Sequence, residues 1–334
     1  MTEQNRVVRL ARRPVGLVSN DDFIIADEPI PEPGEGEFRV RISCISLDPA
    51  MRGWMNAGKS YAPPISVGGI MRAFSAGEVE VSNHPLFKPG DKVTGLFGAQ
   101  KYAVSNGQGA LVVDTKNAPL ERWIGGFGMP GTTAYFGLID IGRPKKGETV
   151  VVSAAAGAVG SLVGQIAKIQ GARAVGIAGG PEKCRIVTEE YGFDACVDYK
   201  AGNLGGELAA ACPDGIDVYF ENVGGEILDT VLPLMNTFGR IPLCGLISAY
   251  SATEPLPGPK NLRSILVNRL TVRGFVIFDF ADRYEEAATA LAMWAGEGRL
   301  KFREDVREGG IDAFPETLKL LYTGGNVGKL VLKV

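Results

Sequence analysis

The spacing of apolar and polar positions changes near residue 125 of this 334-residue chain. Before that point, short apolar runs such as FRVRISCISL, AFSAGEVEV and DKVTGLF lie between turns rich in Gly and Pro, which predicts β-strands. From about residue 148, strand-like and helix-like runs alternate, beginning with ETVVVSAA, AVGSLVGQIAKIQ, RAVGIA and PEKCRIVTEEY. Further buried strands are expected at ACVDYK, DVYFENV, GRIPLCG and TVRGFVIF. This alternation predicts a parallel sheet with helices on both faces.

A loop of small residues joins the first strand and helix of the second region. The stretch AAAGAVGS carries Ala155, Gly157 and Gly160 at the spacing of the dinucleotide fingerprint GxGxxG, with alanine in the first position. Gly157 would let a pyrophosphate approach the backbone, and Gly160 would let the helix pack closely on the strand. The helix N-terminus offers unpaired N–H groups to the phosphates. We therefore predict a dinucleotide cradle here.

The next strand end indicates which nicotinamide cofactor is bound. NAD-binding proteins carry an acidic residue about 20 positions after the glycine loop, where it binds the ribose hydroxyls. That position falls on Gly180, and Lys183 and Arg185 follow it. Glu182 is a competing carboxylate, but it lies in the first turn of the next predicted helix and complements the helix dipole there. The pattern favours NADPH.

Composition and charge exclude several other classes of protein. The net charge of −3 provides no field that would attract nucleic acid or acidic lipid. No apolar run reaches the roughly 18 residues that a membrane span needs, and the N-terminal stretch MTEQNRVVRLARRP lacks the apolar segment of a secretory signal. We expect a cytoplasmic protein with no nucleic-acid or membrane partner.

Histidine and cysteine usage argues against a metal centre. The chain has one histidine, His84, and five widely spaced cysteines with no CxxC motif. Neither a Cys/His zinc site nor a Ser-His-Asp triad can be assembled plausibly from these residues. No metal is expected, and His84 is expected to be an ordinary loop residue.

Several stretches match one known family in the order in which they occur along the chain. They are LDPAMRGWM, GMPGTTAYFGL, AAAGAVGSLVGQIAK, GIAGGPEKC, GFDACVDYK, FENVGG, CGLISAY, GFVIFDF and GGNVGKLVLKV. Together they resemble the zinc-independent medium-chain dehydrogenase/reductases. Within these, the chain is similar to the branch of the leukotriene B4 dehydrogenases, prostaglandin reductases, plant double-bond reductases and bacterial curcumin reductases.

The resemblance implies an α/β fold with two domains. One is a Rossmann domain, a doubly wound parallel sheet, over residues 127–299. The other is a GroES-like, β-rich substrate domain built from both chain ends, residues 1–126 and 300–334. A homodimer is also implied, in which the strand TVRGFVIF could pair edge to edge across a two-fold axis.

The resemblance also assigns residues to the cofactor. Lys183 matches a lysine that binds the 2′-phosphate, and Tyr199 matches a tyrosine near the same phosphate. The complete set of cofactor-binding residues that we expect is Thr133, Ala156, Gly157, Ala158, Val159, Gly179, Lys183, Tyr199, Asn222, Ser248, Tyr250, Phe275, Val276, Phe278 and Asn326.

Two tyrosines are implied as catalytic residues. Tyr250, in CGLISAYS, matches a tyrosine at the substrate carbonyl, and Tyr61, in KSYAPP, resembles another pocket tyrosine. The activity implied is NADPH-dependent reduction of the C=C bond of α,β-unsaturated ketones and aldehydes. Hydride reaches the β-carbon, and the Tyr250 hydroxyl and a cofactor ribose hydroxyl stabilise the resulting enolate. One such hydroxyl donor is worth about 3 kcal/mol.

The chain departs from the zinc-dependent enzymes of the same superfamily. Those enzymes hold their metal with a Cys at the start of a CxxD-like stretch and with a Gly-His-Glu segment. Here the corresponding stretches read ISCISLDPAM and GGIMRAFSAGE, without a histidine. Cys44 and Asp48 remain, and we expect a strand cysteine and a turn aspartate.

Three alternatives remain open. The acceptor could be a quinone, or the reaction could be zinc-independent oxidation of a secondary alcohol. The chain could also bind NADPH without turning it over.

Overall fold

The computed structural model describes residues 3–254 and 257–334, which form two compact units. Unit 1 runs to Gly128 and resumes at Glu304, and unit 2 is Met129–Arg303. Both ends of the chain therefore belong to unit 1. Every helix in the described part of the chain is too short or too polar to cross a lipid bilayer.

Unit 1 is built on a seven-stranded sheet. Its strand order is β14 (Glu304–Arg307), β15 (Lys329–Lys333), β3 (Phe38–Ser46), β4 (Ser75–Ser82), β5 (Lys92–Gly95) and β7 (Leu111–Val112), and β6 (Tyr102–Ser105) also pairs with β3. A second sheet contains β1 (Asn5–Leu10) and β2 (Phe23–Glu28). The helices of this unit are α1 (Ala50–Trp54), α2 (Leu120–Trp123) and α11 (Phe314–Thr323).

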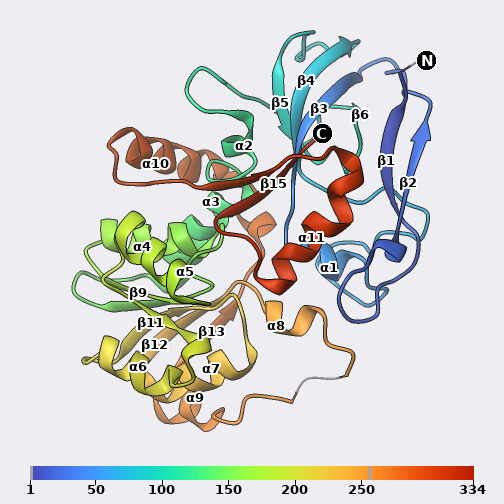
Figure 1. Cartoon of the computed structure of the whole chain (residues 1–334). Coiled ribbons are helices and arrows are strands. Elements are labelled where there is room, and N and C mark those ends of the chain that lie inside the picture. Colours follow the sequence, from blue (N-terminus) through green and yellow to red (C-terminus); the bar gives the residue numbers. More distant parts are fainter. Residues whose placement is uncertain (1–2, 255–256) are drawn as a thin grey trace. The chain divides into compact units, whose positions relative to one another are not determined.

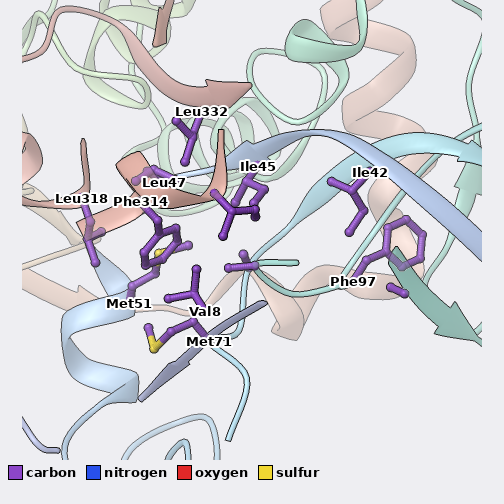
Figure 2. Packing of buried hydrophobic residues seen from close by; sticks show 14 of the residues in the cluster. Val8, Ile42, Ile45, Leu47, Met51, Met71, Phe97, Phe314, Leu318 and Leu332 are labelled. Atoms are coloured by element: carbon purple, nitrogen blue, oxygen red, sulfur yellow. The ribbon is translucent and has the colours of Figure 1, made fainter. Parts of the chain in front are cut away.

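The two ends of the chain share one core in unit 1. Strand β15 pairs antiparallel with β3 and parallel with β14, so the last strand lies inside the sheet (Figure 1). Figure 2 shows residues from the first third of the chain, among them Val8, Ile45 and Met71, packed with Phe314 and Leu332. All five side chains have no exposed surface. Burial of this apolar surface stabilises the unit and depends on both chain ends.

Unit 2 contains a six-stranded parallel sheet with helices. The strand order is β10 (Ala195–Asp198), β9 (Arg173–Ala178), β8 (Thr149–Ser153), β11 (Ile216–Phe220), β12 (Met235–Leu243) and β13 (Thr271–Gly274). The helices are α3 (Met129–Phe136), α4 (Gly160–Ile169), α5 (Pro181–Arg185), α6 (Leu204–Ala211), α7 (Gly225–Val231), α8 (Ile247–Tyr250), α9 (Arg263–Val267) and α10 (Tyr284–Gly296). This topology confirms the predicted α/β class and the Rossmann-like, doubly wound sheet.

One strand differs from its prediction. The run TVRGFVIF was expected to be a buried strand, but β13 ends at Gly274 and all four of its residues are exposed. The reason is that β13 lies at the edge of the sheet, where β12 is its one neighbour among the described residues. The apolar residues that follow pack elsewhere: the Phe275 ring lies 6.2 Å from Phe220 and 6.5 Å from Phe280.

Candidate cofactor and substrate site

Most of the predicted cofactor residues of unit 2 follow directly after its parallel strands. These strand ends carry Ala156, Gly157, Ala158 and Val159 after β8, Gly179 after β9, Tyr199 after β10, Asn222 after β11, Ser248 and Tyr250 after β12, and Phe275 and Val276 after β13. Carboxyl ends of parallel strands share one edge of a sheet. The strand order reverses at β8, and doubly wound sheets bind nucleotides at such a reversal.

The loop after β8 makes its tight turn without the first glycine of the fingerprint. Ala154, one position earlier, takes the left-handed conformation with φ of 51°, and its carbonyl accepts a hydrogen bond of 2.9 Å from the Gly157 N–H. Ala155 is fully buried and packs where Gly176 of β9 leaves room. The alanine at the fingerprint's first position is thus accommodated by a shift of the turn.

The two remaining glycines of the fingerprint have different surroundings. A Cβ added to Gly160 would lie 2.4 Å from the Ala154 carbonyl oxygen, so only glycine allows the helix to start this close to the strand. A Cβ added to Gly157 would meet only that same oxygen, at 3.1 Å. Gly157 is partly exposed, so its backbone can be approached by a ligand, as a pyrophosphate cradle requires.

The ends of β9 and β10 lie together, and the carboxylate nearest to Gly179 and Gly180 comes from Asp198 of β10. The Tyr199 ring covers Gly179, where an added Cβ would lie 2.8 Å from a ring carbon. Asp198 accepts hydrogen bonds at Oδ1 from the backbone N–H groups of Gly180 (2.7 Å) and Lys200 (2.9 Å). Its carboxylate therefore holds the loop in place, and Lys183 is the third residue of α5.

The asparagine after β11 is fixed by a buried network. Asn222 donates from Nδ2 to the Ser153 carbonyl oxygen (2.8 Å) and from its backbone N–H to Ser153 Oγ (2.8 Å). Ser153 Oγ donates in turn to Glu221 Oε1 (2.9 Å), which also accepts from the Val223 N–H (2.6 Å). Glu221 has no exposed surface, and this burial raises the pKa of its carboxyl group. Sequence reasoning missed Glu221 and Ser153, because their pairing joins two strands.

Tyr250 lies at the end of the short helix α8 and faces the start of that helix. Its phenol oxygen lies 3.4 Å from the Leu246 N–H, which donates to it. In this contact the phenol oxygen is the acceptor. Ser248 anchors the same helix, because its Oγ donates to the Val223 carbonyl oxygen at 2.6 Å.

The positions of the other predicted residues of unit 2 say less about cofactor binding. Thr133 is partly exposed on α3, and Phe278 is 47% exposed in the turn after β13. Phe275 packs over Gly137, where an added Cβ would lie 2.5 Å from its ring. Its side chain is therefore part of the packing of unit 2.

Two predicted residues, Tyr61 and Asn326, belong to unit 1. Tyr61 is 56% exposed in the segment between α1 and β4. Asn326 lies before β15 and donates from Nδ2 to the Gly328 carbonyl oxygen at 3.1 Å. Lys329 follows and is 3% exposed.

Asp48 opens the turn before α1, as the sequence predicted, because its carbonyl oxygen accepts from the Met51 N–H at 3.0 Å, but its side chain is buried in an ion pair that the sequence did not predict. It is 5% exposed, and the Lys329 ammonium lies 2.6 Å from its Oδ1. Lys329 also donates to the Leu47 carbonyl oxygen at 2.7 Å, and Ser46 Oγ donates to the other Asp48 oxygen. Burial lowers the pKa of Lys329, while Asp48 opposes that shift. This ion pair joins the ends of β3 and β15, and the separation of 281 positions hides it from sequence patterns.

Neither Cys44 nor His84 gathers metal-ligating neighbours. Cys44 is 1% exposed in β3, and burial raises the pKa of its thiol to about 12. The His84 ring packs edge-on against Phe38 and Phe87, with centroids 5.9 and 4.9 Å apart. Across residues 3–254 and 257–334, no three His, Cys, Asp or Glu side chains are grouped so that they could hold a metal ion.

Comparison with known proteins identifies the family. Residues 6–113 match the profile of the N-terminal domain of oxidoreductase, and residues 158–293 match that of zinc-binding dehydrogenase. The chain is 44% identical over 337 residues to the NADPH-dependent curcumin reductase of Escherichia coli, covering 99% of this chain and 97% of that protein. The chain belongs to the medium-chain dehydrogenase/reductases. The resemblance seen in the sequence is therefore confirmed.

Two further relatives define the branch and the cofactor. The NADP(+)-dependent 2-alkenal reductase of Nicotiana tabacum is 39% identical over 308 residues, covering 91% of this chain and 89% of that enzyme. CurA from Vibrio vulnificus, solved in complex with NADPH, superposes with a TM-score of 0.94 and 44% identity over 98% of this chain and 99% of that one. This medium-chain reductase is an NADPH-dependent oxidoreductase of the curcumin and alkenal reductase type.

The residues of unit 2 fit NADPH. Gly157 offers an approachable backbone, Gly179 and Gly180 carry no side chain at the end of β9, and the nearby Asp198 carboxylate accepts from the backbone N–H groups of Gly180 and Lys200. Lys183 lies on the helix that follows and supplies positive charge.

Proposed function

We propose that this medium-chain reductase reduces the C=C bond of α,β-unsaturated ketones and aldehydes, without zinc. Bound NADPH supplies the hydride. The observation that carries the proposal is the position of Tyr250 beside the strand ends, with a phenol oxygen that accepts from the Leu246 N–H. The 2-alkenal reductase activity named for the tobacco relative supports the same class of substrate.

The proposed residues act by binding and by stabilising charge. Lys183 and Tyr199 bind the 2′-phosphate, the backbone of 156–159 binds the pyrophosphate, and Asn222 and Asn326 contact the remaining cofactor. When the β-carbon is reduced, negative charge moves to the carbonyl oxygen, and the Tyr250 hydroxyl donates a hydrogen bond to it. Tyr61 is the second tyrosine of the substrate pocket. The α-carbon then takes a proton to complete the saturated product.

We propose a reaction without zinc because the residues present do not form a catalytic zinc site. A catalytic zinc site needs about three protein ligands drawn from His, Cys, Asp and Glu. Cys44 is buried with a raised pKa, Asp48 is paired with Lys329, and His84 packs among aromatic rings. A tyrosine hydroxyl takes over the polarising role.

The test measures NADPH and NADH oxidation against enals, enones and a quinone, and NADP⁺ reduction with a secondary alcohol, using wild type and Lys183→Ala. We expect saturable turnover with enals and enones and a preference for NADPH. Loss of one charged phosphate contact should raise the KM for NADPH by roughly 10- to 100-fold and change that for NADH much less.

Lys168→Ala is the matched control, since Lys168 is a helix lysine of the same unit that pairs with Asp194 at 2.7 Å. It should leave both KM values unchanged. Equal effects of Lys183→Ala on the two nucleotides would remove Lys183 from the phosphate site. Turnover of the quinone or the alcohol alone would replace the proposed reaction, and NADPH binding without any turnover would indicate a binding protein.

We also propose a homodimer formed through the edge of the unit 2 sheet. One side of strand β13 is not paired with any strand in residues 3–254 and 257–334, and Val272 is 43% exposed. Leu266 (78% exposed) and Val267 (50%) of the preceding helix α9 add apolar surface. Val272→Lys should weaken a strand-to-strand contact, and sedimentation velocity should show a shift from two chains to one. A wild-type mass of one chain would contradict the proposal.

A further inference from the structure

Two cysteines of unit 2 have their sulfur atoms in direct contact. Cys196 of β10 donates from its Sγ to the Sγ of Cys184 in α5, at a distance of 2.9 Å. Both residues are free thiols and both are partly exposed. The sulfur atoms of a disulfide lie about 2.05 Å apart, so an approach of about 0.9 Å is enough to form the bond.

The backbone of both elements holds this contact in place. Cys196 pairs with Gly176 of β9, and a Cβ added to Gly176 would lie 3.3 Å from the Cys196 sulfur, so the glycine leaves the space that the sulfur occupies. On the other side, the Cys184 N–H donates to the Gly180 carbonyl oxygen at 3.2 Å. The Gly180 N–H donates in turn to Asp198 of β10 at 2.7 Å. The start of α5 is therefore tied to the strand that carries Cys196.

The two thiols differ in how readily they ionise. Burial raises the pKa of both, and the negative charge of Asp198 acts in the same direction. The hydrogen bond between the sulfurs lowers the pKa of Cys184, because it stabilises the Cys184 thiolate, and it raises the pKa of Cys196. Since the thiolate is the form that attacks an oxidant, Cys184 is the attacking sulfur and Cys196 the sulfur that resolves the product.

We propose that Cys184 and Cys196 form a modification site, at which hydrogen peroxide closes an intrachain disulfide between α5 and β10. The Cys184 sulfur attacks one peroxide oxygen, the O–O bond breaks, Cys184 becomes a sulfenic acid, and the other oxygen leaves as water. The Cys196 sulfur then attacks the Cys184 sulfur, the S–S bond forms, and the hydroxyl leaves with the Cys196 proton as a second water. The two electrons lost by the thiols reduce the peroxide, and a dithiol reverses the reaction by exchange.

The disulfide joins the two elements that carry the proposed 2′-phosphate site. Lys183 precedes Cys184 in α5, and Tyr199, which covers Gly179, follows directly after β10. A charged hydrogen bond of about 2.8 Å that lengthens by about 0.9 Å leaves the hydrogen-bonding range. The oxidised protein should therefore bind NADPH more weakly and NADH almost unchanged. This consequence rests on the proposed function of Lys183, whereas the disulfide itself does not.

The test treats the full chain with hydrogen peroxide, labels the remaining thiols with N-ethylmaleimide under denaturing conditions, and maps the peptides by mass spectrometry. Wild type should carry two labels fewer than its five cysteines allow and should yield a peptide that links positions 184 and 196, and dithiothreitol should restore both labels. Cys196→Ser should stop at a sulfenic acid on Cys184, and Cys184→Ser should remain reduced at Cys196. Cys212→Ala is the matched control, because burial raises the pKa of that thiol to about 11, and it should still form the linked peptide.

Fluorescence titration of NADPH and NADH on reduced and oxidised wild type separates this inference from the proposed function, since binding needs no turnover. We expect oxidation to raise the Kd for NADPH roughly 3- to 10-fold and that for NADH much less. Equal rises for both nucleotides would support the disulfide and contradict the role of Lys183. Full labelling of wild type after peroxide would overturn the modification site, and this result requires no variant to fold. A linked peptide with both Kd values unchanged would overturn the effect on the cofactor.

Discussion

Tyr250→Phe is expected to lower kcat for enone reduction about 100- to 1,000-fold, the usual cost of removing one donor from a developing oxyanion. The substitution keeps the ring at the end of α8 and removes only the hydroxyl that lies 3.4 Å from the Leu246 N–H. The effect should appear in kcat more than in the Kd for NADPH, because the hydroxyl is needed most in the transition state. Steady-state kinetics and a fluorescence titration of NADPH measure the two quantities.

Tyr135→Phe is the control for this variant. The Tyr135 hydroxyl donates to Glu286 Oε1 at 2.9 Å, so its loss removes a tyrosine hydroxyl from unit 2 without touching the proposed chemistry. We expect kcat within about a factor of two of wild type. If Tyr250→Phe keeps a third or more of wild-type kcat, the charge-stabilising role passes to Tyr61 and the proposed mechanism is wrong.

Lys329→Met is expected to destabilise the protein by about 3–5 kcal/mol, because it leaves the buried carboxylate of Asp48 without its counter-charge. Lys329 is 3% exposed and its ammonium lies 2.6 Å from Asp48 Oδ1. The urea midpoint of unfolding measures the loss. Replacing both partners, in Lys329→Met with Asp48→Leu, should recover much of it, since an apolar pair carries no unpaired charge.

Lys333→Met on the same strand is the matched control for charge alone. Lys333 is 45% exposed in its side chain, and the Glu308 carboxylate lies 3.4 Å away. Exposed ion pairs contribute about 0–1 kcal/mol, so the midpoint should hardly move. A Lys329→Met variant as stable as Lys333→Met would show that the buried pair adds nothing to the stability of unit 1.

Local sequence patterns predicted the elements that carry the proposed cofactor site. The apolar run before Ala154, the small residues up to Gly160 and the periodic helix after it gave β8, the loop and α4 in their observed order. The sequence also predicted that the position about 20 residues after the loop, Gly180, carries no carboxylate, because this argument depends only on distance along the chain. The turn at Ala154 was not foreseen, because the fingerprint places its glycine one position later.

The features that sequence patterns did not predict depend on contacts between distant segments of the chain. The pair of Asp48 and Lys329 joins residues that no periodic pattern relates. In the sequence Glu221 is not distinguished from other acidic residues. Its role becomes visible only when the pairing of β8 with β11 places it against Ser153. The short extent of β13 depends on which strand occupies the edge of the sheet, and local propensity does not settle that position.

The placement of β15 inside the sheet of unit 1 has a consequence for biosynthesis. Until the ribosome has released Lys329–Lys333, β3 lacks the neighbour to which it pairs through Ser46, Ile45 and Cys44. Met129–Arg303 carries its own core and does not include β15, so its folding does not depend on the arrival of that strand. The part of unit 1 before Gly128 is therefore left with an open strand edge and exposed apolar side chains until β15 arrives, and such surfaces favour aggregation and chaperone binding.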